Sequence, residues 1–409
     1  MSGVLMILQT AFPPDIRVEN EIESLTTAGI EVHLLAQNSG TQATTDTWQK
    51  AVIHRIPAWF GTSILGKLIQ MPFFPNPVWL WYIYKITRLK NLRLLHVHDL
   101  PLTPMAIFFK WLLGLRIIYD MHENYPAALQ VWNKQGLESI FKSYRLARLI
   151  ERLAARSFDH FIAVIEENER RFINEYGIRP SQITVVSNLV VLTRYQPDFV
   201  YSDFVFPTKS KVLIYTGGLD LHRGLGLTLE MFRLIAMRRR NLFLLIVGGG
   251  RSSAGKVEEK RLRDEIAKDA HIGQRVHITG WVDFKYLPWL VQQSDVCLLP
   301  QESNTHTDTT IPHKLFQYMA MGKPVIAADA IPVKRIVQET GAGVVFHSGN
   351  AEDYAAAVEK VLADPAITRY GEMGVTAVMN RYNWEFAASN LLDLYHTAIN
   401  AKSSVKSQS

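Results

Sequence analysis

Short apolar runs alternate with segments of helical periodicity along nearly the whole chain. Segments such as Glu19–Thr27 and Ala351–Leu362 place apolar residues three and four apart, as one face of a helix does. The apolar runs have the length of buried strands and predict parallel sheets with helices on both faces. These runs are Val4–Gln9, Glu31–Ala36, Leu94–His98, Arg116–Tyr119 and Phe161–Val164, followed by Lys211–Thr216, Leu242–Val247, Val276–Thr279, Val296–Pro300, Pro324–Ala327 and Gly343–Phe346.

The pattern restarts after residue 200, which predicts two domains of similar size. Between residues 190 and 210, Pro197, Pro207 and polar residues replace the periodic pattern, so we expect a linker there. The predicted fold class is α/β, with two doubly wound, Rossmann-like domains at residues 1–195 and 205–382 that face a central cleft. A helix over 383–400 and a disordered tail over 401–409 would follow. In such sheets, ligands bind beyond the carboxyl ends of the strands.

The composition allows a large core and excludes wholesale disorder, because 48% of the 409 residues are hydrophobic and 20% are charged. A net charge of +6 and a pI near 9.2 favour anionic partners without choosing among nucleotides, phosphates, acidic lipids and nucleic acid. The single cysteine, Cys297, excludes an internal disulfide and fits a reducing compartment. We expect no signal peptide and no membrane span, hence a cytoplasmic protein that is soluble or at most peripheral to the membrane.

The strand-end loop that opens the second half has the features of a phosphate site. Gly217 and Gly218 allow a close backbone approach, and Arg223 would be a permanently charged, bidentate partner for a phosphate. An ordinary strand–helix turn with a surface arginine is the alternative. Further on, Thr309 or Thr310 would cap a helix whose free N–H groups attract anions, although such caps occur in any helix.

A second candidate, Gly250-Arg-Ser-Ser-Ala-Gly255-Lys256, matches the first seven positions of a phosphate-binding P-loop. The eighth position should be Ser or Thr, whose hydroxyl ligates magnesium, and here it is Val257. We therefore interpret the segment as a chance match or a polar loop, in which Lys256 can still meet a phosphate. A P-loop nucleotidase would require magnesium-dependent ATP hydrolysis that Lys256→Ala abolishes.

Polar residues also follow the strands of the first half. His122 stands at a strand end, where it would bind a sugar or phosphate, or else tether its own loop. His96 and His98 share one face of a strand and have donor atoms suited to a metal, but the sequence indicates no third ligand. The chain also contains no Asp-x-Asp pair, which disfavours a metal–diphosphate site. We expect no metal.

An aromatic and basic stretch runs from Trp59 to Lys90. It would rest on an anionic lipid surface or pack in the core, and the sequence does not decide between the two. Its residues are Trp59, Phe73, Phe74, Trp79, Trp81, Tyr84, Lys85, Arg88 and Lys90.

Taken together, these motifs resemble the retaining nucleotide-sugar glycosyltransferases of family 4, which have the two-domain GT-B fold. Each motif is weak alone, but their order and spacing over nearly the entire chain are specific. The closing Trp384-Glu385 is similar to the start of the family's last helix, which packs back on the first domain. The other motifs are Pro14-Asp15-x-Arg17, His96-Val-His-Asp99, Tyr119-Asp-x-His122-Glu123, Val185-Val-Ser-Asn188, Tyr215-x-Gly217…Arg223-Gly224, Thr279-Gly280-Trp-Val282 and Pro312-x-Lys314-Leu-Phe-x-Tyr-Met-Ala…Gly322-Lys-Pro-Val.

The resemblance implies roles for individual residues. Arg223 would neutralise the donor diphosphate without a metal, and His122 would contact the transferring sugar; these two are the predicted catalytic residues. The predicted acceptor side is Asp15, Arg17 and His98. The predicted donor site, with a backbone contact to the base at Val282 and a diphosphate contact at the two threonines, comprises Gly217, Gly218, Val282, Thr309, Thr310, Lys314, Gln317 and Lys256.

Three positions depart from the family's pattern. Thr309 and Gln317 stand where many members have two glutamates, and Gly218 stands where many have an arginine. Gln317 can still bind ribose hydroxyls, and Lys256 or Lys314 would compensate for the missing arginine.

The resemblance implies transfer of a sugar from a nucleotide-diphosphate sugar, with retained anomeric configuration and front-face displacement. It implies no cofactor. The expected acceptor is a lipid-linked or polysaccharide glycan at the inner face of the plasma membrane, with the anionic membrane surface as a further partner and no nucleic acid. The alternative is a degenerate member that binds nucleotide or a partner protein without turnover.

Overall fold

The computed structural model describes residues 3–40, 42–57, 73, 76–131 and 143–400. The chain divides into two compact units: unit 1 is Met1–Ser187 with Ala387–Ser409, and unit 2 is Asn188–Phe386. The first division therefore lies just before the predicted linker, and the second lies inside the last helix. Trp59, Phe74 and the tail 401–409, for which the sequence makes predictions, are outside the described residues.

Unit 1 contains an eight-stranded sheet in the order β3-β4-β2-β1-β5-β6-β7-β8. All neighbouring pairs are parallel except β3 with β4. The strand order reverses between β1 and β5, so the loops after these strands diverge and leave room for a ligand. The strands are β1 (Val4–Ala11), β2 (Val32–Gln37), β3 (Thr45–Trp48), β4 (Ala51–Ile56), β5 (Leu94–His98), β6 (Arg116–Met121), β7 (His160–Ala163) and β8 (Ile183–Val185).

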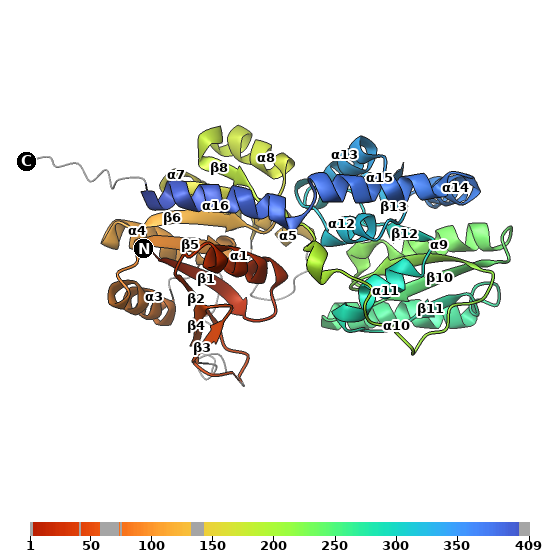
Figure 1. Cartoon of the computed structure of the whole chain (residues 1–409), viewed down its shortest axis with the longest axis horizontal. Helices are drawn as coiled ribbons and strands as arrows, with labels where there is room; N and C mark the ends of the chain where they lie inside the picture. The colour runs from red at the N-terminus through yellow and green to blue at the C-terminus, as the bar shows by residue number, and fades with distance from the viewer. Residues whose placement is uncertain (1–2, 41, 58–72, 74–75, 132–142, 401–409) are drawn as a thin grey trace, which may run out of the picture. The chain divides into compact units, whose positions relative to one another are not determined.

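The two faces of the unit 1 sheet differ in chemistry. One face is apolar and packs against α3 (Pro77–Leu89), α4 (Thr103–Leu113) and α7 (Tyr144–Ser157). The other face carries His96, His98 and Asp120, which alternate along their strands with core residues such as Val97 and Tyr119. Over it lie α1 (Ile16–Thr27) and α16 (Trp384–Asn400), seen across the near side of unit 1 in Figure 1. Unit 1 also contains α5 (Tyr125–Val131) and α8 (Glu166–Tyr176).

The last helix is tied to unit 1 by long-range hydrogen bonds. Tyr395 lies 2.6 Å from Nδ1 of His96, and the Asn390 side chain donates to the carbonyl oxygen of Val185 at 3.0 Å. Near its end, Arg116 of β6 donates to the carbonyl oxygen of Ala398. Through these contacts α16 covers the polar face of the unit 1 sheet.

Unit 2 contains a six-stranded parallel sheet in the order β11-β10-β9-β12-β13-β14. The strands are β9 (Lys211–Thr216), β10 (Leu242–Val247), β11 (Val276–Ile278), β12 (Val296–Leu299), β13 (Val325–Ala328) and β14 (Gly343–Phe346). The order reverses between β9 and β12. The helices are α9 (Leu225–Ala236), α10 (Ser253–Lys268), α11 (Leu287–Gln292), α12 (His313–Ala320), α13 (Ile331–Thr340), α14 (Ala351–Ala363) and α15 (Ile367–Asn380).

All six apolar runs predicted in the second half form strands, and so do all five in the first half. Three further strands, β3, β4 and β8, were not predicted. β3 and β4 form an antiparallel hairpin whose polar residues, such as His54 and Arg55, hide the strand pattern. β8 has three residues, too few to show periodicity.

Candidate functional site

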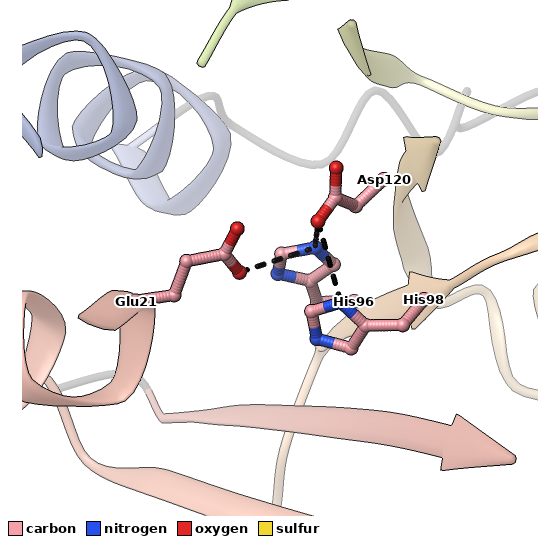
Figure 2. Close-up of side chains that lie close together, drawn as sticks. All are labelled: Glu21, His96, His98 and Asp120. Atoms are coloured by element: carbon pink, nitrogen blue, oxygen red, sulfur yellow. Dashed lines mark ion pairs between the residues drawn. The ribbon is translucent and has the colours of Figure 1, made fainter. Parts of the chain in front are cut away.

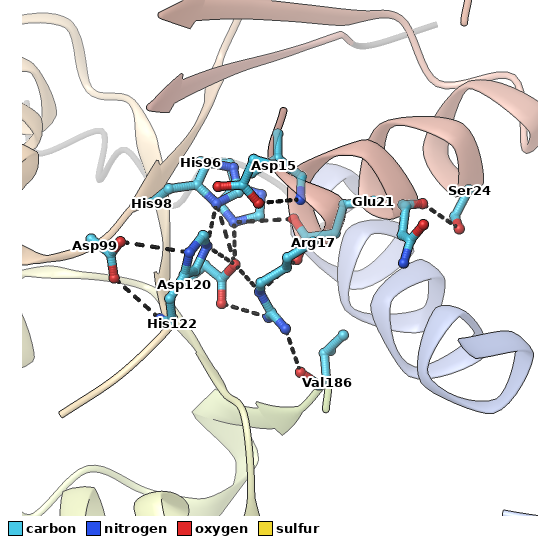
Figure 3. A network of polar contacts seen from close by, with 12 residues as sticks. Asp15, Arg17, Glu21, Ser24, His96, His98, Asp99, Asp120, His122 and Val186 are labelled. Carbon is cyan, nitrogen blue, oxygen red and sulfur yellow. Dashed lines mark hydrogen bonds and ion pairs between the residues drawn. The ribbon is translucent and has the colours of Figure 1, made fainter. Parts of the chain in front are cut away.

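Unit 1 holds a buried charge network where its strand order reverses. The network comprises Arg17, Glu21, His96, His98, Asp99, Asp120 and His122, and Figure 3 shows how they converge. Register explains the convergence: His98 of β5 pairs with Asp120 of β6, and α1 lies over both strands. The contributions come from segments more than 100 residues apart along the chain.

Arg17 and Asp120 form the centre of the network. The guanidinium donates to both carboxylate oxygens at 2.7 and 2.8 Å, and also to the carbonyl oxygen of Val186 at 2.8 Å. The Arg17 side chain is 3% exposed and Asp120 is fully buried. Burial alone would raise the pKa of Asp120, but Arg17 and then His122 outweigh it and hold that pKa well below its usual range.

His122 lies between two carboxylates, as Figure 3 shows. Its Nε2 is 3.1 Å from Oδ2 of Asp120, and its Nδ1 is 3.5 Å from Oδ2 of Asp99. Nδ1 of His98 is 3.0 Å from the same Nε2. Burial lowers the pKa of His122, but Asp99 and Asp120 together raise it to about 10. The imidazole is therefore a cation at neutral pH, suited to donate hydrogen bonds and unsuited to act as a base.

Behind this centre lie groups whose polar atoms lack hydrogen-bond partners. Both carboxylate oxygens of Glu21, Nε2 of His96 and Nε2 of His98 are buried without one. Figure 2 shows Glu21 and Asp120 converging on His96, at 4.0 and 3.8 Å from its Nε2. Burial and then Asp120 raise the pKa of Glu21 well above its usual range. Protonation of this carboxyl removes a buried negative charge next to the negative charge of Asp120.

The sequence indicates no third ligand beside His96 and His98, and the structure corrects this. Glu21 and Asp120 offer oxygen atoms, and the four ligand atoms all lie within 4.8 Å of one another. However, Arg17 donates to Asp120 and its Nε is 3.1 Å from Glu21. A divalent ion held by both carboxylates would face this fixed charge at short range in a buried site. We therefore interpret the four side chains as a proton-sharing group, and metal independence stays a prediction.

The structure corrects two of the predicted acceptor-side residues. Arg17 and His98 are 3% and 0% exposed, so neither side chain can contact an acceptor in this conformation. Arg17 acts instead on Asp120. Asp15, which is half-buried, has a local role as the N-cap of α1: it accepts from the N–H of Val18, and its own N–H donates to Glu19.

Because the pKa of His122 is raised in the folded state, we predict that the protein becomes less stable as the pH rises above neutral. A group whose pKa is higher in the folded state stabilises fully below its unfolded pKa, about 6.5, and loses that contribution as the pH rises through its folded value, about 10. Between these limits we expect the free energy of unfolding of the wild type to fall by up to about 1.4 kcal/mol per pH unit relative to His122→Gln. Urea unfolding at several pH values measures this, and parallel curves for the two proteins would contradict it.

Unit 2 holds a cationic cluster at the corresponding point of its own sheet, where β9 and β12 diverge. We define it as Arg223, Lys314, His222 and His306. Arg223 follows β9 and donates to the side chain of Gln301, just after β12, at 3.3 Å; its Nε is buried without a hydrogen-bond partner. Burial, and then the neighbouring His222 and Arg223, lower the pKa of His306 to about 4. The His306 imidazole is therefore neutral at pH 7, and Arg223 supplies the permanent positive charge of the cluster.

Lys314 adds a second basic group to this cluster. Its Nζ lies 4.1 Å from the centre of the Tyr215 ring, and burial followed by Arg223 lowers its pKa well below the usual value. Gly217, with φ 130°, makes room for it: a Cβ at that position would lie 2.5 Å from Nζ. Across the described residues, neither Arg223 nor Lys314 forms an ion pair with a carboxylate. A permanent cation beside a buried amine, both without a carboxylate partner, meets the electrostatic requirement of an anion site, because a bound anion favours the charged form of the amine.

The helix start in this region differs from the prediction. Pro312, not Thr309 or Thr310, is the N-cap of α12, and no side chain caps it. The threonine hydroxyls instead donate to the carbonyl oxygens of the preceding turn, at 3.0 to 3.1 Å, because that turn is a short 3-10 helix. Pro312 therefore does not cap α12 through its side chain, as Thr309 or Thr310 would have done. Gln317 lies half-buried one turn further on.

The geometry agrees with the interpretation of Gly250–Lys256 as a chance match to a P-loop. Helix α10 begins at Ser253 with Ser252 as its N-cap, so Gly255 and Lys256 already lie in the first helical turn. In a P-loop the residues between the two glycines form the loop around the phosphates, whereas here Ser253 and Ala254 already belong to the helix. Lys256 is exposed, and the structure does not bring it to the cationic cluster through any described contact.

The remaining donor-site candidates occupy strand-end loops of unit 2. Gly218 follows β9 and accepts from the hydroxyl of Tyr215 through its carbonyl oxygen at 2.8 Å. Val282 lies half-buried in the loop after β11. The sequence therefore locates the strand ends correctly but does not indicate Gln301, His222 or His306, whose roles depend on the pairing of β9 with β12.

Two Rossmann-like units, each with polar or cationic residues at its strand-order reversal, define the class of two-domain nucleotide-binding α/β proteins. Residues 16–194 match the family described as Glycosyltransferase Family 4, and residues 201–374 match Glycosyl transferases group 1. The two regions together cover most of the chain. The chain belongs to the family 4 glycosyltransferases, and its fold is the GT-B fold.

Relatives and solved structures agree with this assignment. The chain is 25% identical to the D-inositol 3-phosphate glycosyltransferase of Rhodococcus opacus over 246 residues, 59% of this chain and 53% of that protein. A second such enzyme, from Catenulispora acidiphila, is 25% identical over 262 residues, 62% of this chain and 60% of the relative. The chain thus spans little more than half the length of the curated relatives it matches.

The structural similarity covers nearly the whole chain. Sucrose-phosphate synthase from Thermosynechococcus elongatus has a TM-score of 0.79 at 18% identity, covering 98% of this chain and 99% of that one. The Anabaena protein HepE in complex with UDP and glucose has a TM-score of 0.73 at 14% identity, with 97% and 100% covered. At these identities the similarity establishes the fold.

Proposed function

We propose that this chain is a nucleotide-sugar-dependent glycosyltransferase that binds the donor diphosphate at the cationic cluster of unit 2. The observation that carries the proposal is the pair Arg223 and Lys314, two basic groups with no carboxylate partner among the described residues, at the start of α12, whose N-cap is Pro312. A guanidinium matches two phosphate oxygens at once, and helix amides add further donors. The HepE complex with UDP and glucose supports this class of ligand for the fold.

In the proposed reaction, the bond between the anomeric carbon and the diphosphate oxygen breaks, and a bond to the acceptor oxygen forms on the same face. The acceptor proton passes to the leaving diphosphate. Arg223 and Lys314 stabilise the charge that develops on the leaving group, and His122 donates a hydrogen bond to the transferring sugar. The configuration is retained, and neither a metal nor a cofactor takes part.

A donor panel tests the activity. Purified protein is incubated with UDP-, GDP-, ADP- and dTDP-sugars, with and without EDTA, and nucleotide release and thermal stabilisation are measured. We expect one nucleotide class to raise Tm and to turn over, equally with and without EDTA. Binding without turnover would favour the degenerate member suggested by Thr309 and Gln317. No binding would contradict the proposal, and loss of activity in EDTA would contradict metal independence.

For the acceptor we propose a lipid-linked or polysaccharide glycan. The structure supplies a basic-aromatic face on unit 1, formed by the outer surfaces of α3, α4 and α7. The acidic residue within these helices, Glu151, is buried and paired with Arg171. The face combines exposed apolar and basic side chains: Trp81, Tyr84, Leu89, Phe108, Trp111, Leu112, Tyr144, Leu149 and Leu153, with Lys85, Arg88, Arg145, Arg152 and Arg156.

This face fits an anionic bilayer. Trp111 is 82% exposed and Leu89 is 72% exposed, values that are unfavourable in water but suited to the headgroup region. Lys85 lies 4.6 Å from the centre of the Trp81 ring, so charge and aromatic surface share one patch. Trp79 and Phe73, by contrast, are buried in the core, so these two residues are not available to a membrane. None of the described helices has both the length and the apolarity to span a bilayer.

Vesicle co-sedimentation tests the membrane contact. We expect binding to phosphatidylglycerol vesicles, weak binding to phosphatidylcholine, and release at high salt because exposed charges are screened. Trp111→Ser should weaken binding at least about threefold through loss of apolar burial. Val205→Ser, at a residue of unit 2 that is 85% exposed, is the control and should bind like the wild type. Equal binding to both lipids would contradict the charge-based contact.

The relatives supply the competing acceptor class, a small phosphorylated polyol, because their names specify D-inositol 3-phosphate. Both acceptor classes belong in the same assay. Transfer to inositol phosphate, with vesicles making no difference, would replace the lipid-linked acceptor by the soluble one.

A further inference from the structure

The backbone of Asp99 is strained. Its φ is 62° and its ψ is 163°, a combination that essentially only glycine adopts without cost. Asp99 follows β5, and its N–H remains bound to the carbonyl oxygen of Asp120 at 3.0 Å, so the chain turns away abruptly at this residue. Such strain persists where the surroundings hold it, and it concentrates at functional positions.

Helix capping does not explain an aspartate at this position. Asp99 precedes a short 3-10 helix, Leu100–Leu102, but its side chain makes no capping hydrogen bond. Asp15 provides the comparison within the same unit: it caps α1 through its side chain and has an ordinary φ of −149°. The strained residue therefore has a different task from the capping residue.

That task concerns His122. Oδ1 of Asp99 accepts from the backbone N–H of His122 at 3.3 Å, and Oδ2 lies 3.5 Å from its Nδ1. Asp120 holds the opposite edge of the ring, at Nε2. One carboxylate thus holds the backbone and one ring edge of His122, while the other carboxylate holds the second edge. Together they fix the rotation of the imidazole.

Asp99 and His122 are the most exposed members of the network. Asp99 and His122 are 29% and 16% exposed, whereas Arg17, Glu21, His96, His98 and Asp120 are at most 3% exposed. The 3.5 Å contact between Asp99 and Nδ1 is also longer than the 3.1 Å contact on the buried edge. Nδ1–H is therefore held less closely than Nε2–H, in the part of the network that solvent reaches.

We propose that Asp99 is a positioning residue whose strained backbone places its carboxylate against His122, fixing the imidazole so that Nδ1–H is presented to a sugar hydroxyl of the substrate. The proposal rests on the proposed function, in which His122 contacts the transferring sugar. Asp99 acts through His122 and takes no part in bond making or breaking.

Three variants test it in the full chain. Asp99→Gly removes the carboxylate and the strain together, and Asp99→Asn keeps one acceptor oxygen. Lys209→Gly is the matched control, because Lys209 has the same φ of 62° but lies outside both clusters. The measurements are Tm, kcat and KM for the donor, and side-chain 15N resonances of histidine in the free protein, with His122→Gln to assign the signal.

For Asp99→Gly we expect a Tm close to that of the wild type, because relief of the backbone strain offsets the lost contact with His122. We also expect a shifted His122 Nδ1 resonance and a kcat lowered at least about tenfold, with KM within about threefold, since small misplacements of a positioned group are costly. Asp99→Asn should recover part of kcat. Lys209→Gly should leave the resonance and kcat unchanged. A lowered Tm with a proportional loss of activity, or an unmoved His122 resonance, would overturn the proposal. If the wild type turns over no donor, the proposed function fails, and the Tm and NMR results still decide whether Asp99 positions His122.

Discussion

Arg223→Ala is expected to lower kcat/KM for the nucleotide-sugar donor by roughly 10²–10³, the range seen when one preorganised donor to a developing oxyanion is removed. Arg223 has one described side-chain hydrogen bond, a 3.3 Å contact to Gln301, and its Nε is buried without a partner. The substitution therefore removes little that holds the fold together. Initial rates over a range of donor concentrations measure the effect, and Tm confirms that the variant is folded.

Two further variants sharpen this result. Arg223→Lys keeps the charge but loses the bidentate geometry, so it should recover only part of the activity. Arg238→Ala is the control: this arginine also belongs to unit 2, but it is 74% exposed and pairs with Glu359. It should behave like the wild type. Equal activity of Arg223→Ala and Arg238→Ala would show that the cationic cluster does not bind the donor diphosphate.

Lys314 and Arg223 should not act independently. Arg223 contributes to lowering the pKa of Lys314, so the two cations share one electrostatic environment. If both hold one diphosphate, the double variant should lose less activity than the product of the single losses.

The sheets could be predicted because buried parallel strands leave a signal in the sequence. Runs such as Leu242–Val247 are continuous and apolar since both of their faces are covered. The hairpin β3–β4 could not be predicted, because it lies at a sheet edge where polar residues such as His54 are tolerated. The same limit applies to β8 at the other edge.

The sequence indicates where along the chain the site residues lie, but not which of them come into contact. Strand ends identify His122 and Arg223, since the carboxyl edge of a parallel sheet collects its ligand-binding residues. Burial, however, depends on what covers a residue. Arg17 lies in a loop-and-helix segment typical of an exposed site, yet Asp120, Val186 and the surrounding elements enclose it. Glu21 joins His96 only because α1 and β5 pack together, and nothing in the local pattern indicates that.

Asp120→Asn is expected to destabilise unit 1 by about 3–5 kcal/mol, the usual cost of leaving a buried charge without its partner. Asp120 compensates two cations: the Arg17 guanidinium at 2.7 and 2.8 Å and the His122 ring at 3.1 Å. An amide has the same shape but no charge, so the loss reports the charge itself. Because a domain is commonly stable by about 5–15 kcal/mol, much of that stability would disappear. Urea unfolding, followed by circular dichroism, measures the change.

Glu175→Gln is the matched control for this loss. It too removes a carboxylate that pairs with an arginine of unit 1, but Arg148 and Glu175 are 31% and 34% exposed, and such pairs contribute about 0–1 kcal/mol. A partial rescue completes the test: Arg17→Met with Asp120→Leu removes the buried arginine together with its partner and leaves His122 to Asp99. It should be more stable than Asp120→Asn, in which the Arg17 charge stays buried without that partner. If Asp120→Asn cost no more than Glu175→Gln, water or another group would have to compensate Arg17, and the network would not be held together by charge.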